Sequence, residues 1–121
     1  MGKKVLVVDD SKAIRQSISF VLDQNGYQVL EGADGLEGLS RLNSDKVDLI
    51  ITDINMPNLD GIGFIKKVRE RDESRYTPIL VLTTESQKTI MDEGKAAGAT
   101  GWIVKPFSTD KLLDAVKKVC G

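Results

Sequence analysis

The stretch Leu49-Ile50-Ile51-Thr52-Asp53-Ile54-Asn55-Met56-Pro57-Asn58-Leu59-Asp60-Gly61 joins an apolar run to an acid and then to a turn. An apolar run of this length, bounded by turn residues, predicts a strand that is buried on both faces of a parallel sheet. Pro57 prevents the strand from continuing, because proline has no N–H to donate to a neighbouring strand. Asp53 is therefore expected at the carboxyl end of a strand, where open α/β sheets bind their ligands.

Further apolar segments alternate with amphipathic ones along the rest of the chain. Strands are expected at residues 5–8, 27–31, 49–53, 78–82 and 102–104, with the second at an edge of the sheet. A helix follows each strand; Ser11 and Ser108 have the positions of helix caps, and residues 34–37 have the spacing of a capping box that Leu36, Leu39 and Leu42 continue. Five strands alternating with five helices predict an α/β fold, the flavodoxin-like (βα)5 doubly wound parallel sheet with strand order 2-1-3-4-5.

The composition is that of a globular protein. The chain has 121 residues, 40% of them hydrophobic, with a net charge of −1 and a single cysteine, and it contains no histidine. We therefore expect one domain over residues 1–121, without a disulfide and without histidine-based catalysis. The balanced charge gives no reason to expect nucleic acid as a partner, and no apolar run approaches the roughly 20 residues of a membrane span. The expected location is cytoplasmic.

Four of the expected strands end in polar residues. These are Asp9-Asp10, Asp53, Thr83-Thr84 and Lys105. In the order 2-1-3-4-5 the first and third strands are neighbours, about 4.8 Å apart, so Asp10 and Asp53 should face each other with Asp9 beside them. Hard oxygen ligands without nitrogen or sulfur indicate Mg2+. An acid next to such an ion, a lysine and a hydroxyl is a set that can accept a phosphoryl group.

Over its whole length the chain resembles a known family, the receiver domains of bacterial two-component response regulators. The resemblance is strongest to the single-domain, CheY-like chemotaxis regulators. It rests on four motifs, which are Val7–Ser11, Thr52–Gly61, Leu82-Thr83 and Val104–Phe107. It implies a phosphorelay signalling switch, and not a classical enzyme, in which Asp53 takes phosphate from the phosphohistidine of a sensor histidine kinase. Intrinsic autophosphorylation and autodephosphorylation would accompany this role.

The resemblance also implies how the metal is held. Asp10, Asp53 and the backbone carbonyl of Asn55 would bind Mg2+, and Asp9 would act mainly through a ligated water. Lys105 would pair with the phosphoryl oxygens.

A switch is implied as well. The peptide bond from Lys105 to Pro106 would be cis. Thr83 would move towards the phosphoryl group, and Trp102 would rotate inward into the space that it vacates. Asn55 and Glu85 occupy positions that tune self-dephosphorylation in the family.

The implied output surface is built from the fourth helix, the fifth strand and the fifth helix. Its lysines are Lys88, Lys95, Lys111 and Lys117. We expect a monomer that binds a target protein, such as a flagellar motor switch component or another effector, and that a phosphatase can reset. No nucleic acid or membrane partner is expected.

Three alternatives remain open on the residues alone. A small phosphatase with an aspartyl-phosphate intermediate needs a similar set of groups, but the first strand ends in adjacent aspartates and not in Asp-x-Asp. A phosphorelay intermediate would use the same acceptor without a chemotaxis output. A flavin-binding electron carrier shares the strand order, but Asp9-Asp10 would repel the phosphate of the flavin.

Overall fold

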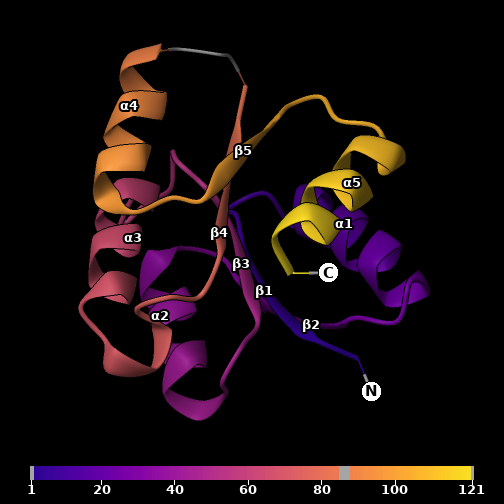
Figure 1. The fold of residues 1–121 in the computed structure, drawn as a ribbon, viewed down its shortest axis with the longest axis horizontal. Coiled ribbons are helices and arrows are strands. Elements are labelled where there is room, and N and C mark those ends of the chain that lie inside the picture. The colour runs from indigo at the N-terminus through magenta and orange to yellow at the C-terminus, as the bar shows by residue number, and fades with distance from the viewer. Residues whose placement is uncertain (1, 85–87, 121) are drawn as a thin grey trace.

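The computed structural model describes residues 2–84 and 88–120, which form a five-stranded parallel sheet with helices on both faces (Figure 1). The strands are β1 (Lys4–Val8), β2 (Gln28–Gly32), β3 (Leu49–Asp53), β4 (Ile79–Thr83) and β5 (Gly101–Val104). The helices are α1 (Lys12–Gln24), α2 (Gly35–Ser44), α3 (Gly61–Arg69), α4 (Lys88–Ala97) and α5 (Thr109–Cys120), with a short 3-10 helix, η1, at Asp72–Ser74. The strand order is β2-β1-β3-β4-β5, which confirms the predicted fold, including β2 at an edge.

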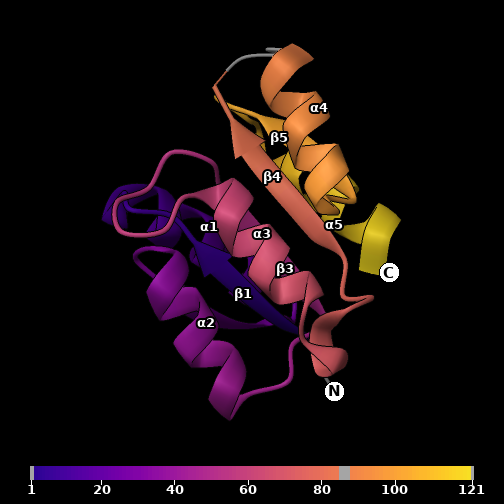
Figure 2. The same cartoon turned by 90° about the vertical axis from the view of Figure 1, so that its left-hand side faces the viewer.

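The helices form two layers that bury opposite faces of the sheet. Helices α1 and α5 lie on one side, and α2, α3 and α4 on the other, as Figures 1 and 2 both show. Successive residues of β1 point to alternate faces: Val7 joins the core under α1 and α5, while Val8 joins the core that contains Phe64 of α3. These three residues have no exposed surface, so each of the two cores excludes solvent at these positions.

Local chemistry sets where the helices begin and end. Side-chain oxygens of Ser11, Asp34 and Asp60 accept the backbone N–H of the residue three positions on, and so cap α1, α2 and α3. Ser108 does the same for α5 at 3.1 Å. Gly98 ends α4 with a φ of +118°, a backbone angle that residues with a side chain rarely adopt. The caps predicted for α1, α2 and α5 are thus confirmed.

The register of the strands determines which polar residues meet. Val8 of β1 pairs with Thr52 of β3, so Asp9, one residue further, comes level with Asp53. On the other side, Asp53 pairs with Leu82 of β4, and Thr83 pairs with Val104 just before Lys105. The carboxyl ends of four strands therefore bring their polar residues to one edge of the sheet.

The start of α3 lies directly against the end of β3. A Cβ at Gly61 would approach the carbonyl oxygen of Asp53 to 2.2 Å, which no side chain can do. The Gly61 N–H instead donates to the carbonyl of Ile54 at 2.8 Å. Glycine here allows the loop after Asp53 to fold back tightly before α3 begins.

Within the described part of the chain, α1 is the longest helix at 13 residues, and none has the length and hydropathy needed to cross a bilayer.

Candidate functional site

Three carboxylates converge at the carboxyl ends of β1 and β3. Oxygen atoms of Asp9, Asp10 and Asp53 all lie within 4.8 Å of one another. Asp9 is fully buried, Asp53 is partly buried and Asp10 is exposed. The backbone N–H of Ser11 donates to Asp9 Oδ1 at 2.8 Å, and that of Ile54 donates to Asp53 Oδ1 at 2.8 Å. These bonds fix the direction of the two carboxylates.

Lys105 places one positive charge against this cluster. Its Nζ lies 3.2 Å from Asp9 Oδ2 and 3.5 Å from Asp53 Oδ1. Its backbone N–H donates to the carbonyl oxygen of Thr83 at 2.6 Å, which holds the end of β5 against the end of β4. The peptide bond from Lys105 to Pro106 is cis, as the resemblance implied.

The charge balance of the cluster favours a cation. The pKa of Asp53 is raised, first because burial disfavours the charged carboxylate and next because the charge of Asp9 repels it. Lys105 and the N–H of Ile54 oppose this effect only in part. A single lysine thus leaves the three acids under-neutralised, and a divalent ion would restore the balance.

The remaining predicted residues fall into two places. Asn55 and Thr83 line a hollow of about 250 Å³ together with Asp53 and Lys105, and Thr83 is buried. Trp102 does not line this hollow. It lines a different one beside α5 and packs partly buried against Gly94 of α4, where an added Cβ would meet the indole ring at 3.2 Å. The inward rotation of Trp102 stays a prediction.

Two expectations concern residues outside the described part. Glu85 lies there, as does the side chain of Lys88. By contrast, Lys95, Lys111 and Lys117 are exposed on α4 and α5 as expected.

The sequence reading did not identify Arg15 as part of the site. The Arg15 guanidinium donates to the backbone carbonyl of Asp9 at 2.6 Å and pairs with Glu31 of β2 at 3.1 Å. It therefore fixes the backbone at the first acid of the pair. The available signal was its spacing, because a residue four positions after the cap Ser11 lies one turn along the same helix face.

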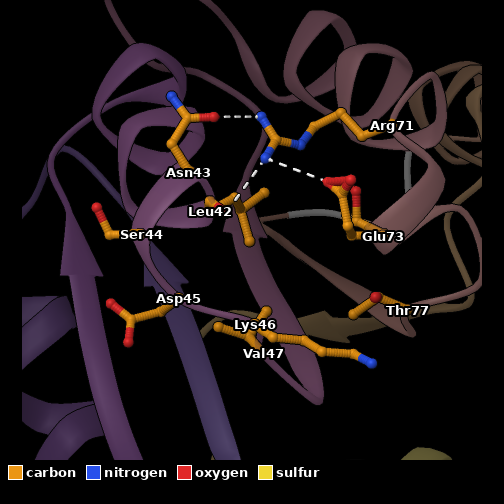
Figure 3. A pocket seen from close by; sticks show the side chains of 10 residues that line it. Leu42, Asn43, Ser44, Asp45, Lys46, Val47, Arg71, Glu73 and Thr77 are labelled. Carbon is orange, nitrogen blue, oxygen red and sulfur yellow. Dashed lines mark hydrogen bonds and ion pairs between the residues drawn. The ribbon is translucent and has the colours of Figure 1, made fainter.

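A larger hollow, of about 390 Å³, lies at the opposite edge of the sheet (Figure 3). It is lined by the end of α2, the loop before β3, and the segment around η1. Arg71 crosses one side of it, donating to Asn43 Oδ1 at 2.7 Å and to the carbonyl of Leu42 at 3.2 Å, and lies 3.8 Å from Glu73. Glu73 lies beside Arg71, and Asp45 pairs with Lys4 outside the hollow, so size alone does not make it the functional site.

Comparison with known proteins agrees with this geometry. The response regulator receiver domain profile matches residues 5–117. Sporulation initiation phosphotransferase F of Bacillus subtilis is 34% identical over 118 residues, which cover 98% of this chain and 94% of that protein. The phosphate regulon regulator PhoB of E. coli is 36% identical over 119 residues, and the chain spans 52% of the length of that longer protein.

Solved structures show the same likeness. The chemotaxis response regulator CheY4 of Vibrio cholerae superposes with a TM-score of 0.95 at 47% identity, covering 98% of this chain and 99% of that one. The receiver domain of the sensor histidine kinase PA1611 of Pseudomonas aeruginosa, solved with a magnesium ion in its active-site cleft, superposes with a TM-score of 0.92 at 26% identity, covering 100% of this chain and 99% of that one. The family profile covers nearly the whole length, and both the sequence relatives and the solved structures agree with it. The chain therefore belongs to the receiver domains of two-component response regulators.

Proposed function

We propose that Asp53 accepts a phosphoryl group from the phosphohistidine of a sensor histidine kinase, and that this transfer switches the chain between two binding states. Receiver domains as a family take phosphate from histidine kinases and bind effector targets. The observation that carries the proposal is the convergence at one sheet edge. Lys105 reaches Asp9 and Asp53 at 3.2 and 3.5 Å, where three carboxylates from two strands lie within 4.8 Å.

The donor set fits Mg2+. Asp10, Asp53 and the backbone carbonyl of Asn55 would hold the ion, and the exposure of Asp10 leaves room for the waters that Mg2+ retains. Asp9 is already engaged by Lys105 and by the N–H of Ser11, so it would act mainly through a ligated water. When bound, the ion supplies positive charge to the phosphoryl oxygens.

The residues of the chain carry the transfer as follows. A carboxylate oxygen of Asp53 attacks the phosphorus in line with the histidine nitrogen, so that an O–P bond forms as the N–P bond breaks. The leaving nitrogen keeps the electron pair of the broken bond. Lys105 then offers its ammonium group to a phosphoryl oxygen, and the hydroxyl of Thr83, which lines the same hollow, donates to another.

The test is chemical phosphorylation in the absence of a kinase. Incubation with a small acyl- or amido-phosphate donor and Mg2+ should add one phosphate that is stable to acid and labile to base. Asp53→Asn should abolish the signal. Asp60→Asn is the matched control, because Asp60 caps α3 and asparagine caps a helix equally well. Persistence of the phosphate in Asp53→Asn would reject the assignment.

The same reaction would proceed slowly without partners. Self-phosphorylation by small donors and hydrolysis by water at the acyl phosphate are the expected intrinsic activities, and a separate phosphatase would accelerate the second. Turnover of ordinary phosphomonoesters would instead support a small phosphatase.

The proposed output surface is the α4-β5-α5 face, with the exposed Lys95, Lys111 and Lys117. Movement of Thr83 towards the phosphoryl group would allow Trp102 to rotate and alter this face. A flagellar motor switch component is the proposed target, because CheY4, a chemotaxis regulator, is 47% identical. Profiling which kinase phosphorylates the chain fastest tests this choice, since preference for a relay kinase would favour a phosphorelay intermediate.

A further inference from the structure

A hydrogen bond between Asp34 and Asn58 joins two loops that lie next to the acidic cluster. Asn58 Nδ2 donates to Asp34 Oδ2 at 2.6 Å, while the backbone N–H of Glu37 donates to Asp34 Oδ1 at 2.9 Å. Asp34 is only 9% exposed. One oxygen of this buried carboxylate therefore caps α2, and the other holds the loop between β3 and α3. We call this pair the Asp34–Asn58 clasp.

The loop held by the clasp has a constrained backbone. Asn58 adopts a φ of +68°, in the left-handed region that asparagine tolerates better than most residues. A second bond joins the same two segments, because the N–H of Gly35 donates to the carbonyl of Leu59 at 3.3 Å. Figure 2 shows the start of α2 beside the loop that leads into α3. The loop is thus fixed at its middle by the neighbouring helix, and the clasp supplies the shorter of the two contacts.

This loop carries Asn55, whose backbone carbonyl is the proposed third ligand of the metal ion, beside the carboxylates of Asp10 and Asp53. Asn55 lines the hollow beside Asp53 and lies three residues before Asn58. Asn55 lies two residues beyond the end of β3, so strand pairing alone does not fix its backbone. Asp34 is outside the carboxylate cluster and does not compete for the ion.

We propose that the Asp34–Asn58 clasp positions the loop of residues 54–60 so that the Asn55 carbonyl can bind the divalent ion. Asp34 and Asn58 are then positioning residues, acting through Asn55 without touching the ion. The inference rests on the proposed function, because it assumes that the acidic cluster binds Mg2+. Loss of a partner that orients a metal ligand typically weakens affinity by about tenfold or more.

The first variant separates the clasp from backbone strain. Asn58→Gly removes the amide, but glycine adopts a positive φ without strain, so the fold is retained and the stability lost is that of the hydrogen bond to Asp34 alone. Its dissociation constant for Mg2+ should rise by about tenfold. Asn25→Gly is the matched control: Asn25 is also exposed, and its amide donates to the carbonyl of Val21 at 2.8 Å, but it lies at the far end of α1. Its dissociation constant should not change.

The second variant exchanges the two groups. The double substitution Asp34→Asn with Asn58→Asp keeps an amide opposite a carboxylate, keeps the net charge, and retains a good cap for α2. The exchange should return the dissociation constant for Mg2+ to within about twofold of the wild-type value. If Asp34 only capped α2, Asn58→Gly would not change the dissociation constant at all.

The readout is Mg2+ affinity measured by titration calorimetry, with the rate of phosphorylation by a small donor measured at saturating Mg2+. We expect Asn58→Gly to change the affinity and leave the saturated rate intact. An unchanged affinity in Asn58→Gly, or an exchange that fails to restore it, overturns the clasp but not the proposed function. Failure of the wild-type protein to bind Mg2+ overturns both.

Discussion

Asp53→Asn should stabilise the metal-free protein, although it removes the proposed phosphoacceptor. At an effective dielectric constant of about 20, two charges within 4.8 Å repel by at least about 3.5 kcal/mol, and Lys105 at 3.5 Å returns about 4.7 kcal/mol. Asp53 faces two such acids and one lysine, which leaves a net repulsion of about 2 kcal/mol before water screens the exposed Asp10. We therefore expect a gain of about 1 kcal/mol, or about 4 °C in Tm.

The gain has a defined dependence on pH and on metal. Because the folded-state pKa of Asp53 is raised, its ionisation lowers stability as pH rises from the ordinary carboxyl pKa of about 4 through the folded value. The advantage of Asp53→Asn should therefore be present at neutral pH and absent below about pH 4. Mg2+ at ten times its dissociation constant stabilises the wild type by about 1.4 kcal/mol, which should erase the advantage.

Thermal unfolding with a chelator, and then with Mg2+, measures each of these effects. Asp60→Asn serves as the control, because it removes a carboxylate outside the cluster and retains the cap of α3. A lower Tm for Asp53→Asn in chelator at neutral pH would refute the reasoning. So would an equal advantage at low and neutral pH, since a charge effect must vanish when the acid is protonated.

Three further outcomes follow from the packing and the hydrogen bonds. Phe64→Ala empties a site with no exposed surface, so denaturant unfolding should show a loss of about 3–5 kcal/mol. Arg69→Met removes a guanidinium that donates to the carbonyls of Gly98 and Thr77, among others, and should cost about 2 kcal/mol or more in the same assay. Hydrogen bonds from the Glu37 N–H and the Asn58 amide lower the pKa of Asp34, so its contribution is present above the ordinary carboxyl pKa and is lost as pH falls through the folded value. Asp34→Asn should therefore flatten the acid limb of a stability-against-pH profile.

The sheet and its order could be predicted because buried parallel strands are apolar on both faces and alternate with helices. The complete packing face of α2 could not be predicted, although Leu39 and Leu42 of the leucine pattern do pack against the core. Leu36 continues the leucine pattern but is 53% exposed, while Gly35 and Gly38 are buried. A Cβ at Gly38 would lie 2.8 Å from the ring of Phe64, so α2 approaches its neighbours through glycine as well as through Leu39 and Leu42. A periodic pattern of apolar side chains cannot reveal the part of a helix face that packs closely because its glycines have no side chain.

Part of the site could be predicted from the strand order, and part could not. Asp9, Asp10, Asp53 and Lys105 follow strands whose neighbours are set by topology, so their convergence follows from the strand order. The Asp34–Asn58 clasp depends on a contact between residues 24 positions apart, and each half alone has the pattern of an ordinary cap or turn residue. Arg15 is close to Asp9 in sequence, but its contact depends on how α1 lies against the end of β1. Contacts of this kind are identified only from the three-dimensional structure.

The two edges of the sheet also divide the molecule for practical use. All the polar groups of the site follow the carboxyl ends of strands, whereas Tyr76, 88% exposed, precedes β4 at the opposite edge. A dye, an affinity handle or an inserted reporter domain attached near Tyr76 would leave the opposite edge of the sheet, with the acids and Lys105, uncovered. The protein could thus be tethered to a sensor surface by this end, with its chemistry facing outward.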